Sequence, residues 1–165
     1  MRLRDMEELI KKVEQWSVKR GLNTADPSKQ RLKLWEEFGE LNASMARNDR
    51  EGAIDAIGDM LVVMIIYCQQ KKYYSIYRLF EFDIENYEFL RKLETEALID
   101  STAYEILHLR NFIQSIKDIV TRLSIIAERY GAELDWCLES AYDEIKDRRG
   151  KMVNGVFVKE SDLNG

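Results

Sequence analysis

KLWEEFGELNASMARNDREGAIDAIGD, residues 33–59, contains two runs of helix-forming residues joined by the polar segment NDREG (residues 48–52). The first run carries three carboxylates, Glu36, Glu37 and Glu40. On a helix that turns by about 100° per residue they fall at about 0°, 100° and 40°, which places them on one face. The stretch predicts a helical hairpin whose first arm has an acidic face.

Asp55 and Asp59 lie one helical turn apart in the second arm, so they also share a face. Five acids that face one another across a hairpin repel unless a cation lies between them. Carboxylate oxygens are the ligands that Mg²⁺ prefers. A solvated acidic face is the alternative. We predict a divalent metal site, for Mg²⁺ with Mn²⁺ as the alternative ion, held by Glu36, Glu37, Glu40, Asp55 and Asp59.

Three other residues of this stretch fit such a site. Lys33 lies at about 60° on the acidic arc, so its ammonium group could contact a phosphate beside the metal. Gly39 and Gly58 each directly precede an acid, although glycine within a helix costs about 1 kcal/mol relative to alanine. That cost predicts a close approach of another helix or of a ligand.

Apolar residues recur at three- and four-residue steps through most of the chain, which predicts an all-α bundle. Asp26 and Pro27 are a helix start signal, with an N-cap acid before a proline. Asn154-Gly155 between apolar residues predicts a tight turn or small hairpin in a short tail. Residues 73–90 are aromatic-rich, and we expect them to be helical or irregular. The helices expected with most support span residues 5–20, 27–46, 53–71, 101–130 and 133–148.

Composition limits the classes of function. The chain has 165 residues, 45% of them hydrophobic, which suits one domain with a real core. The net charge of −5 argues against binding to nucleic acid through its phosphates. The longest apolar run, residues 60–68, is too short to cross a membrane. Cys68 and Cys137 lie in apolar contexts, which indicates reduced, buried thiols and a cytoplasmic protein.

The acidic stretch resembles the MazG-like family of all-α nucleoside triphosphate pyrophosphohydrolases, whose signature is EExxE followed by ExxD on the next helix. The first half is present as Glu36-Glu37-Phe38-Gly39-Glu40. AYDEIKDRRGKMVNGVFVKE, residues 141–160, resembles the end of short MazG-like proteins often encoded by phages. Trp16 followed by Arg20-Gly21-Leu22 also fits. The similarity covers about residues 5–70 and 122–160.

The resemblance implies a single MazG-like domain over residues 1–165, with a core of about 5–71 and 122–160. Residues 72–121 have no counterpart in the short family members and are expected to be an inserted helical segment. The implied activity is Mg²⁺-dependent hydrolysis of a nucleoside triphosphate to the monophosphate and pyrophosphate. A homodimer or higher oligomer is also implied.

The resemblance assigns catalytic roles to Glu36, Glu37 and Glu40, and spacing does not indicate which of them is the base. Substrate contacts are expected from Lys33, Lys146, Arg149 and Asn154. Base and sugar preference stay open.

One position departs from the family signature. The glutamate of ExxD would fall at Ala56, and an acid stands one residue earlier, at Asp55. This departure keeps open a degenerate family member that binds nucleotides or a regulatory partner without turnover. A helical interaction module built around residues 101–130 is a third possibility, in which the acids are incidental.

Overall fold

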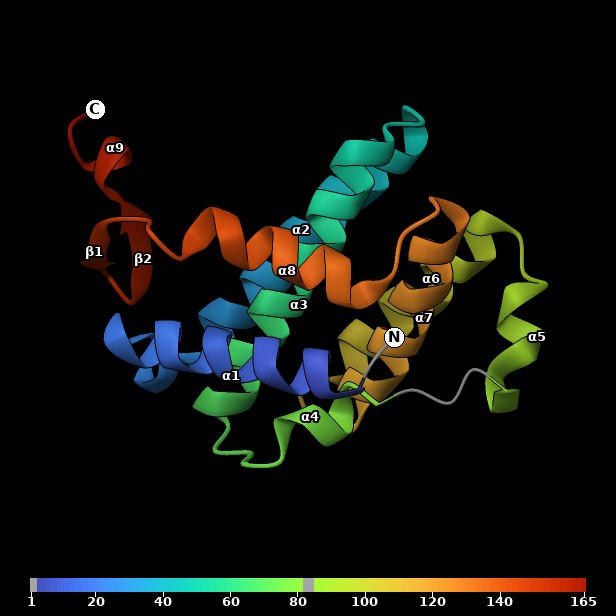
Figure 1. Ribbon diagram of the computed structural model, residues 1–165, viewed down its shortest axis with the longest axis horizontal. Helices are drawn as coiled ribbons and strands as arrows, with labels where there is room; N and C mark the ends of the chain where they lie inside the picture. Colours follow the sequence, from blue (N-terminus) through green and yellow to red (C-terminus); the bar gives the residue numbers. More distant parts are fainter. Residues whose placement is uncertain (1–2, 82–84) are drawn as a thin grey trace.

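The computed structural model describes residues 3–81 and 85–165. Within these ranges nearly every element is a helix and the one sheet has two short strands, which confirms the all-α prediction (Figure 1). The elements are α1 (Leu3–Lys19), η1 (Leu22–Thr24), α2 (Pro27–Ala46), α3 (Arg50–Gln70), α4 (Ile76–Leu79), η2 (Glu85–Tyr87), α5 (Glu88–Arg91), α6 (Thr95–His108), α7 (Ser115–Arg129), α8 (Leu134–Ile145), β1 (Gly150–Val153), β2 (Val156–Lys159) and α9 (Glu160–Leu163).

Helix α3 is the centre of the fold. It packs along α2 and against α8, and it also contacts α1 and α7 (Figure 1). Residues 60–68 are buried at every position. A helix that is apolar all round must be covered on every side, and the surrounding helices provide that cover. In the described ranges no helix combines the length and the apolar character needed to cross a membrane.

Side-chain caps fix the N-terminal ends of α2 and α3, the two helices of the helical hairpin. The carboxylate of Asp26 accepts a hydrogen bond from the backbone two residues on, and Pro27 opens α2, as predicted. The carboxylate of Asp49 accepts a hydrogen bond from the backbone N–H of Gly52 at 3.0 Å. This cap starts α3 at Arg50, three residues earlier than the start near residue 53 that the sequence predicts.

The single helix predicted over residues 101–130 is wrong. The chain forms two helices there, α6 and α7, which pack against each other. Arg122 of α7 donates a hydrogen bond to the Ser101 hydroxyl at 2.6 Å, and Tyr67 donates one to the Leu109 carbonyl at the break. Folding back buries the apolar stripes of both halves, which one straight helix would leave partly in water.

The region predicted to be inserted, residues 72–121, shares the main hydrophobic core. Its expected end falls inside α7, which contacts α3. The described part of residues 73–90 forms short helical turns, and residues 82–84 lie outside the described ranges. Core side chains from the region include Ile76, Leu79, Phe80, Leu90, Leu98 and Ile106.

The C-terminal hairpin confirms the predicted turn. Strands β1 and β2 pair antiparallel, with Val153 opposite Val156. Asn154 and Gly155 form the two-residue connection with φ of 50° and 79°. Two consecutive positive φ angles are the geometry that this dipeptide favours.

Both cysteines are free and buried, as predicted. Burial raises the pKa of Cys68 and of Cys137 to about 12. The thiolate is the reactive form of cysteine, so neither residue is a nucleophile at neutral pH.

Candidate functional site

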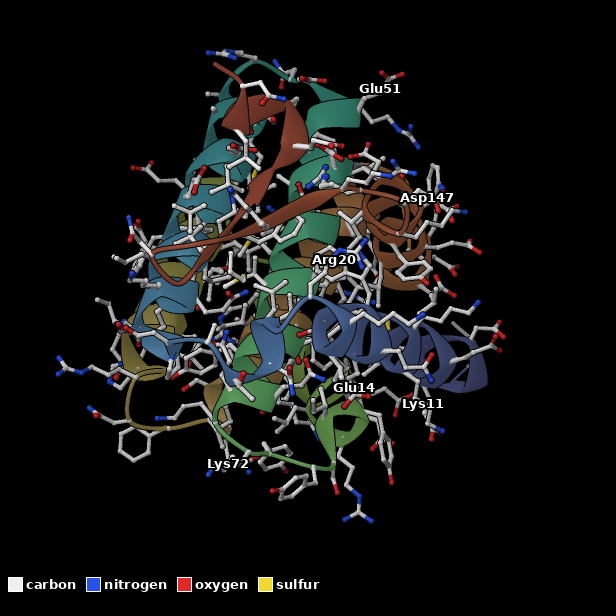
Figure 2. The ribbon with its side chains drawn as sticks, turned by 90° about the vertical axis from the view of Figure 1, so that its left-hand side faces the viewer. Lys11, Glu14, Arg20, Glu51, Lys72 and Asp147 are labelled. Atoms are coloured by element: carbon white, nitrogen blue, oxygen red, sulfur yellow. The ribbon has the colours of Figure 1, made fainter. Side chains whose placement is uncertain are left out.

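A cavity of about 440 Å³ lies between α2, α3, α8 and the C-terminal hairpin. Figure 2 views this side of the molecule, with the hairpin in red in front of α2 and α3. The structure brings together at this cavity the acids of both hairpin arms and the neighbouring lysine. The predicted site residues that line it are Lys33, Glu36, Glu37, Glu40, Asp55 and Asp59.

Helix α2 contributes a buried carboxylate. Glu37 is only 4% exposed, and its Oε1 accepts an ion-pair contact from Lys33 Nζ at 2.8 Å. Glu37 Oε2 has no hydrogen-bond donor among the described residues, although it is buried. Lys33 also pairs with Glu36 at 3.2 Å. One lysine therefore partners two carboxylates and leaves one buried oxygen unpaired.

The same electrostatics raise the pKa of Lys33. Burial disfavours the charged ammonium group, but the hydrogen bonds and attraction of Glu37 and Glu36 outweigh this effect. Burial, followed by repulsion from Glu37, raises the pKa of Glu40. The α2 wall thus carries more negative charge than Lys33 alone neutralises.

Helix α3 contributes the two aspartates. Burial raises the pKa of Asp59 from 3.8 to about 7, with further repulsion from Glu37, Asp55 and Glu144. Burial and repulsion from Glu144 also raise the pKa of Asp55. Asp59 therefore holds its proton to a much higher pH than an ordinary aspartate when no cation is bound.

Gly58 allows α8 to pack directly on the acidic part of α3. A Cβ at this position would collide with the Cys137 carbonyl oxygen and meet the Ala141 side chain at 2.9 Å. The close approach predicted for Gly58 is confirmed. No atom lies within 4 Å of a Cβ placed at Gly39, so the same explanation fails for Gly39.

The close packing brings a further acid to the cavity. Glu144 of α8 lines the same wall and was absent from the predicted set. In the sequence Glu144 follows Ala141 by three positions, so the two residues share one side of α8. Ala141 is buried in the structure, but nothing in the sequence indicates that this side of α8 packs on α3.

Position 56, where the resemblance would place a glutamate, does not face the cavity. Ala56 is 2% exposed, belongs to the hydrophobic core and is not part of the cavity wall. Asp55, one residue earlier, does line the cavity. On this helix it is position 55 that faces the other acids.

Of the basic residues predicted to contact the substrate, only Lys33 lines the cavity. Lys29, Arg148 and Lys159 line it, whereas Lys146, Arg149 and Asn154 do not. Lys146 is exposed and pairs with Asp143 at 2.8 Å. The backbone carbonyl of Asn154 accepts a hydrogen bond from Lys29, which holds the hairpin turn against α2.

Two aromatic side chains, Trp16 and Phe157, also line the cavity. The rings of Trp16 and Phe157 pack edge to face with centroids 6.0 Å apart. Trp16 Nε1 donates a hydrogen bond to the Ile145 carbonyl at 2.8 Å. The Arg20 guanidinium lies 4.6 Å from the Trp16 ring centroid and donates to the Arg148 carbonyl at 2.7 Å. Figure 2 shows Arg20 between α1 and the C-terminal segment, where these contacts fix the indole ring.

A second cavity, of about 510 Å³, lies between α1 and α8. It is also acidic, but none of the acids that line it is buried. They are Asp5, Glu8, Glu133, Asp135 and Glu139. Its charges are those of a solvated surface.

The chemistry of the first cavity suits a hard cation. Its donors are carboxylate oxygens, and Glu37 Oε2 is buried without a partner. As the side chains stand, no three Asp, Glu, His or Cys residues in the described ranges converge closely enough to hold a metal. Lys33 lies against Glu36 and Glu37 instead. Metal binding therefore requires Lys33 to move and the carboxylates to turn inward.

Comparisons with known proteins give one informative similarity. No family model and no solved structure matches the chain. The chain is 44% identical over 73 residues to the "uncharacterized 18.2 kDa protein in rep-hol intergenic region" of Haemophilus phage HP1. The similarity covers 44% of this chain and 45% of the phage protein, less than half of each. It relates the chain to a phage protein and leaves the activity to be argued from the site.

Proposed function

We propose that this protein is a MazG-like, Mg²⁺-dependent nucleoside triphosphate pyrophosphohydrolase. The observation that carries the proposal is the buried, unpaired Oε2 of Glu37 in a wall of acids from two helices. Lys33 pairs with one oxygen of this carboxylate, and the second, buried oxygen without a partner costs stability. A divalent cation is the partner that such a set of oxygens favours. The reaction converts an NTP or dNTP and water to the monophosphate and pyrophosphate.

Glu37 and Asp59 would hold the metal, with Glu36, Glu40 and Asp55 around them. Mg²⁺ (or Mn²⁺) there would supply neutralisation of the phosphate charge and activation of a water molecule. Lys33 already lies beside these acids, so its ammonium group can turn from Glu36 and Glu37 to a phosphate oxygen.

We assign the role of proton acceptor for the attacking water to Glu40, which lies one turn from Glu36 on the acidic face of α2. Its pKa is raised by burial and by Glu37, which brings it closer to neutral pH than an ordinary glutamate. The water oxygen bonds to the α-phosphorus, the bond from that phosphorus to the bridging oxygen breaks, and pyrophosphate leaves. Such a displacement needs positioning and charge stabilisation more than any further group.

The rest of the cavity matches the rest of a nucleotide. Lys29, Arg148 and Lys159 provide positive charge for the triphosphate on the hairpin side. Phe157, which is half-buried and packs edge to face on the buried Trp16, offers an aromatic ring to a nucleobase.

The test is a panel of ribo- and deoxynucleoside triphosphates with Mg²⁺, in which monophosphate and pyrophosphate are both measured. We expect Glu37→Gln to lower turnover at least about 100-fold, as loss of a metal-binding group does. Glu51→Gln is the matched control, since Glu51 is exposed near the α2–α3 turn, at the top of Figure 2, and outside the cavity. Equal activity of both variants would refute the site.

Nucleotide binding without turnover is the second candidate. Ala56 faces the core, and no three acids converge on a metal position in residues 3–81 and 85–165; both observations favour this candidate. Its signature is thermal stabilisation by Mg²⁺ with nucleotide and no release of pyrophosphate.

A helical interaction module is the third candidate. Tyr104, Leu107 and Phe112, near the α6–α7 connection, are 58–61% exposed. No effect of any triphosphate on the melting temperature would favour this candidate. We also propose the homodimer that the family resemblance implies, and light scattering would test it.

A further inference from the structure

We propose that Gln30 of α2 is a specificity-determining residue of this cavity and selects the base of the nucleotide. It favours cytosine and adenine, which carry an amino group where uracil, thymine and guanine carry a carbonyl oxygen. This group is at position 4 of a pyrimidine and position 6 of a purine. The inference rests on the proposed function, because it concerns the base of the nucleotide that the site would hold.

Gln30 lies on the same side of α2 as the residues proposed to hold the metal and the phosphates. Seven residues separate it from Glu37, which is about two helical turns or about 10 Å along the axis. Lys33 lies one turn from each of them, and all three line the cavity. An amide, an ammonium group and a carboxylate therefore follow one another along α2. A nucleotide presents its base, its phosphates and its metal ion in the same order.

The part of α3 opposite Gln30 is apolar. Val62, Val63 and Ile66 line the cavity there and are each at most 7% exposed. They follow Asp59 by one to two helical turns, so the apolar wall continues directly from the acids. A flat, neutral ring would gain by covering these side chains, whereas a phosphate would not.

A hydrogen bond to α3 fixes the orientation of the Gln30 amide. Gln30 Nε2 donates to the backbone carbonyl of Val63 at 3.2 Å. A carbonyl oxygen can only accept, so the NH₂ group and not the oxygen of the amide must face it. The group of Gln30 that remains for a ligand is therefore Oε1, an acceptor.

This oxygen is free and accessible. Within residues 3–81 and 85–165 no group donates to Gln30 Oε1, and it is not among the buried unpaired atoms, unlike Oε1 of Gln69 and of Gln70. Among the described residues that line the cavity, Trp16 is the other uncharged side chain with a hydrogen-bonding group. Its Nε1 already donates to the Ile145 carbonyl. Gln30 Oε1 is thus the uncharged group that this wall offers to the edge of a base.

The C-terminal hairpin is held beside Gln30. Lys29, the preceding residue, donates a hydrogen bond to the backbone carbonyl of Asn154 in the hairpin turn. Phe157 of the same hairpin lines the cavity. Phe157 would contact the face of the base and Gln30 its edge, so the two residues have separate effects on binding and on selectivity.

The fixed amide explains why selectivity follows. An amino group of the base donates to Gln30 Oε1. A carbonyl oxygen in its place would meet Oε1 as a second acceptor. If the amide turned over to donate to that oxygen, Oε1 would face the Val63 carbonyl instead. Both arrangements leave two acceptors unpaired, and a site built for one hydrogen-bonding group discriminates strongly against an analogue that lacks it.

The test compares kcat/KM for pyrophosphate release within pairs of nucleotides that have the same ring size, with Mg²⁺ present. The pairs are dCTP with dUTP and ATP with ITP, whose base carries a carbonyl oxygen at position 6. We expect the unchanged protein to prefer the amino member by at least about tenfold in each pair that it hydrolyses. Equal values within the pairs would overturn the inference.

Gln30→Met assigns the preference to this residue. Methionine has a similar length and shape but cannot form these hydrogen bonds, so the ratio within a pair should fall to near one, mainly because KM rises for the amino member. Gln69→Met is the matched control. Gln69 also donates to a backbone carbonyl of a neighbouring helix, that of Glu14, at 3.2 Å, but it lies outside the cavity. The control should keep the preference, and a Gln30→Met variant that also keeps it would overturn the inference.

The inference and the proposed function fail in different ways. If the unchanged protein releases pyrophosphate equally well from both members of each pair, only the role of Gln30 is wrong. If it binds nucleotides without turnover, the same preference is expected in the Kd values of non-hydrolysable analogues of these pairs. If it neither binds nor hydrolyses any triphosphate, both are wrong. The comparison on the unchanged protein decides even if thermal unfolding shows that Gln30→Met is not folded.

Discussion

Asp59→Asn should stabilise the metal-free protein, and more so at high pH. The unfolded chain has an aspartate pKa near 3.8, and the folded protein raises it to about 7. Between these values the folded state binds more protons than the unfolded state, so its stability falls as the pH rises from about 4 to about 7. Each pKa unit corresponds to about 1.4 kcal/mol. The shift therefore corresponds to about 4 kcal/mol at pH 8 and about 2 kcal/mol at pH 5.

Asparagine has nearly the shape of aspartic acid and no charge, so the variant should recover these amounts. The assay is urea unfolding with a chelator present, at pH 5 and at pH 8. Asp143→Asn, at an exposed ion pair on α8, should change stability little at either pH. A gain for Asp59→Asn that is equal at the two pH values would refute the assigned environment of Asp59.

Added Mg²⁺ should reverse the order. A cation that binds only the folded state stabilises it in proportion to the logarithm of its concentration over Kd. The unchanged protein should therefore gain stability at pH 8, and Asp59→Asn should gain much less. Asp59→Asn would therefore be more stable than the unchanged protein without metal, and it would bind Mg²⁺ more weakly.

Three further substitutions test other parts of the site. Lys33→Gln should bind Mn²⁺ more tightly without nucleotide, because the ammonium group that competes for the carboxylates is gone. The same variant should bind a triphosphate more weakly. Calorimetry measures both affinities, and a loss of both would contradict the role of Lys33. Gly58→Ala should destabilise the fold by about 1–3 kcal/mol through its clash with α8, whereas Gly39→Ala, in open space, should stabilise it by up to about 1 kcal/mol in urea unfolding. Phe157→Ala should raise the KM for the nucleotide more than it lowers kcat. An unchanged KM would contradict the proposed contact between Phe157 and the nucleobase.

The sequence predicts the hairpin of α2 and α3 well because its signals are local. Periodic apolar residues and the cap at Asp26 define α2 without reference to the rest of the fold. The break between α6 and α7 has no such signal. The apolar stripe continues from Leu109 to Ile116, and neither glycine nor proline lies between them. A helical pattern of this kind does not distinguish a straight helix from two that fold back.

The acidic wall of the cavity could be predicted for the same reason, but its other walls could not. Lys146 and Arg149 share a face only if the helix continues, and α8 ends at Ile145. Beyond that end Arg148 reaches the cavity instead. Glu144 depends on the contact of α8 with Gly58, and such a contact between distant segments leaves no periodic trace in the sequence.

The order in which the walls occur along the chain has a consequence for synthesis. The acids of α2 and α3 are close in sequence and can come together as soon as these two helices emerge from the ribosome. Arg148 and the strand that carries Lys159 emerge only about a hundred residues later. Until then the nascent chain exposes an acidic groove whose cations are Lys29 and Lys33 of α2, without Arg148 and Lys159. A cation that enters early would hold the groove open, and strands β1 and β2 would then close over it once they are synthesised.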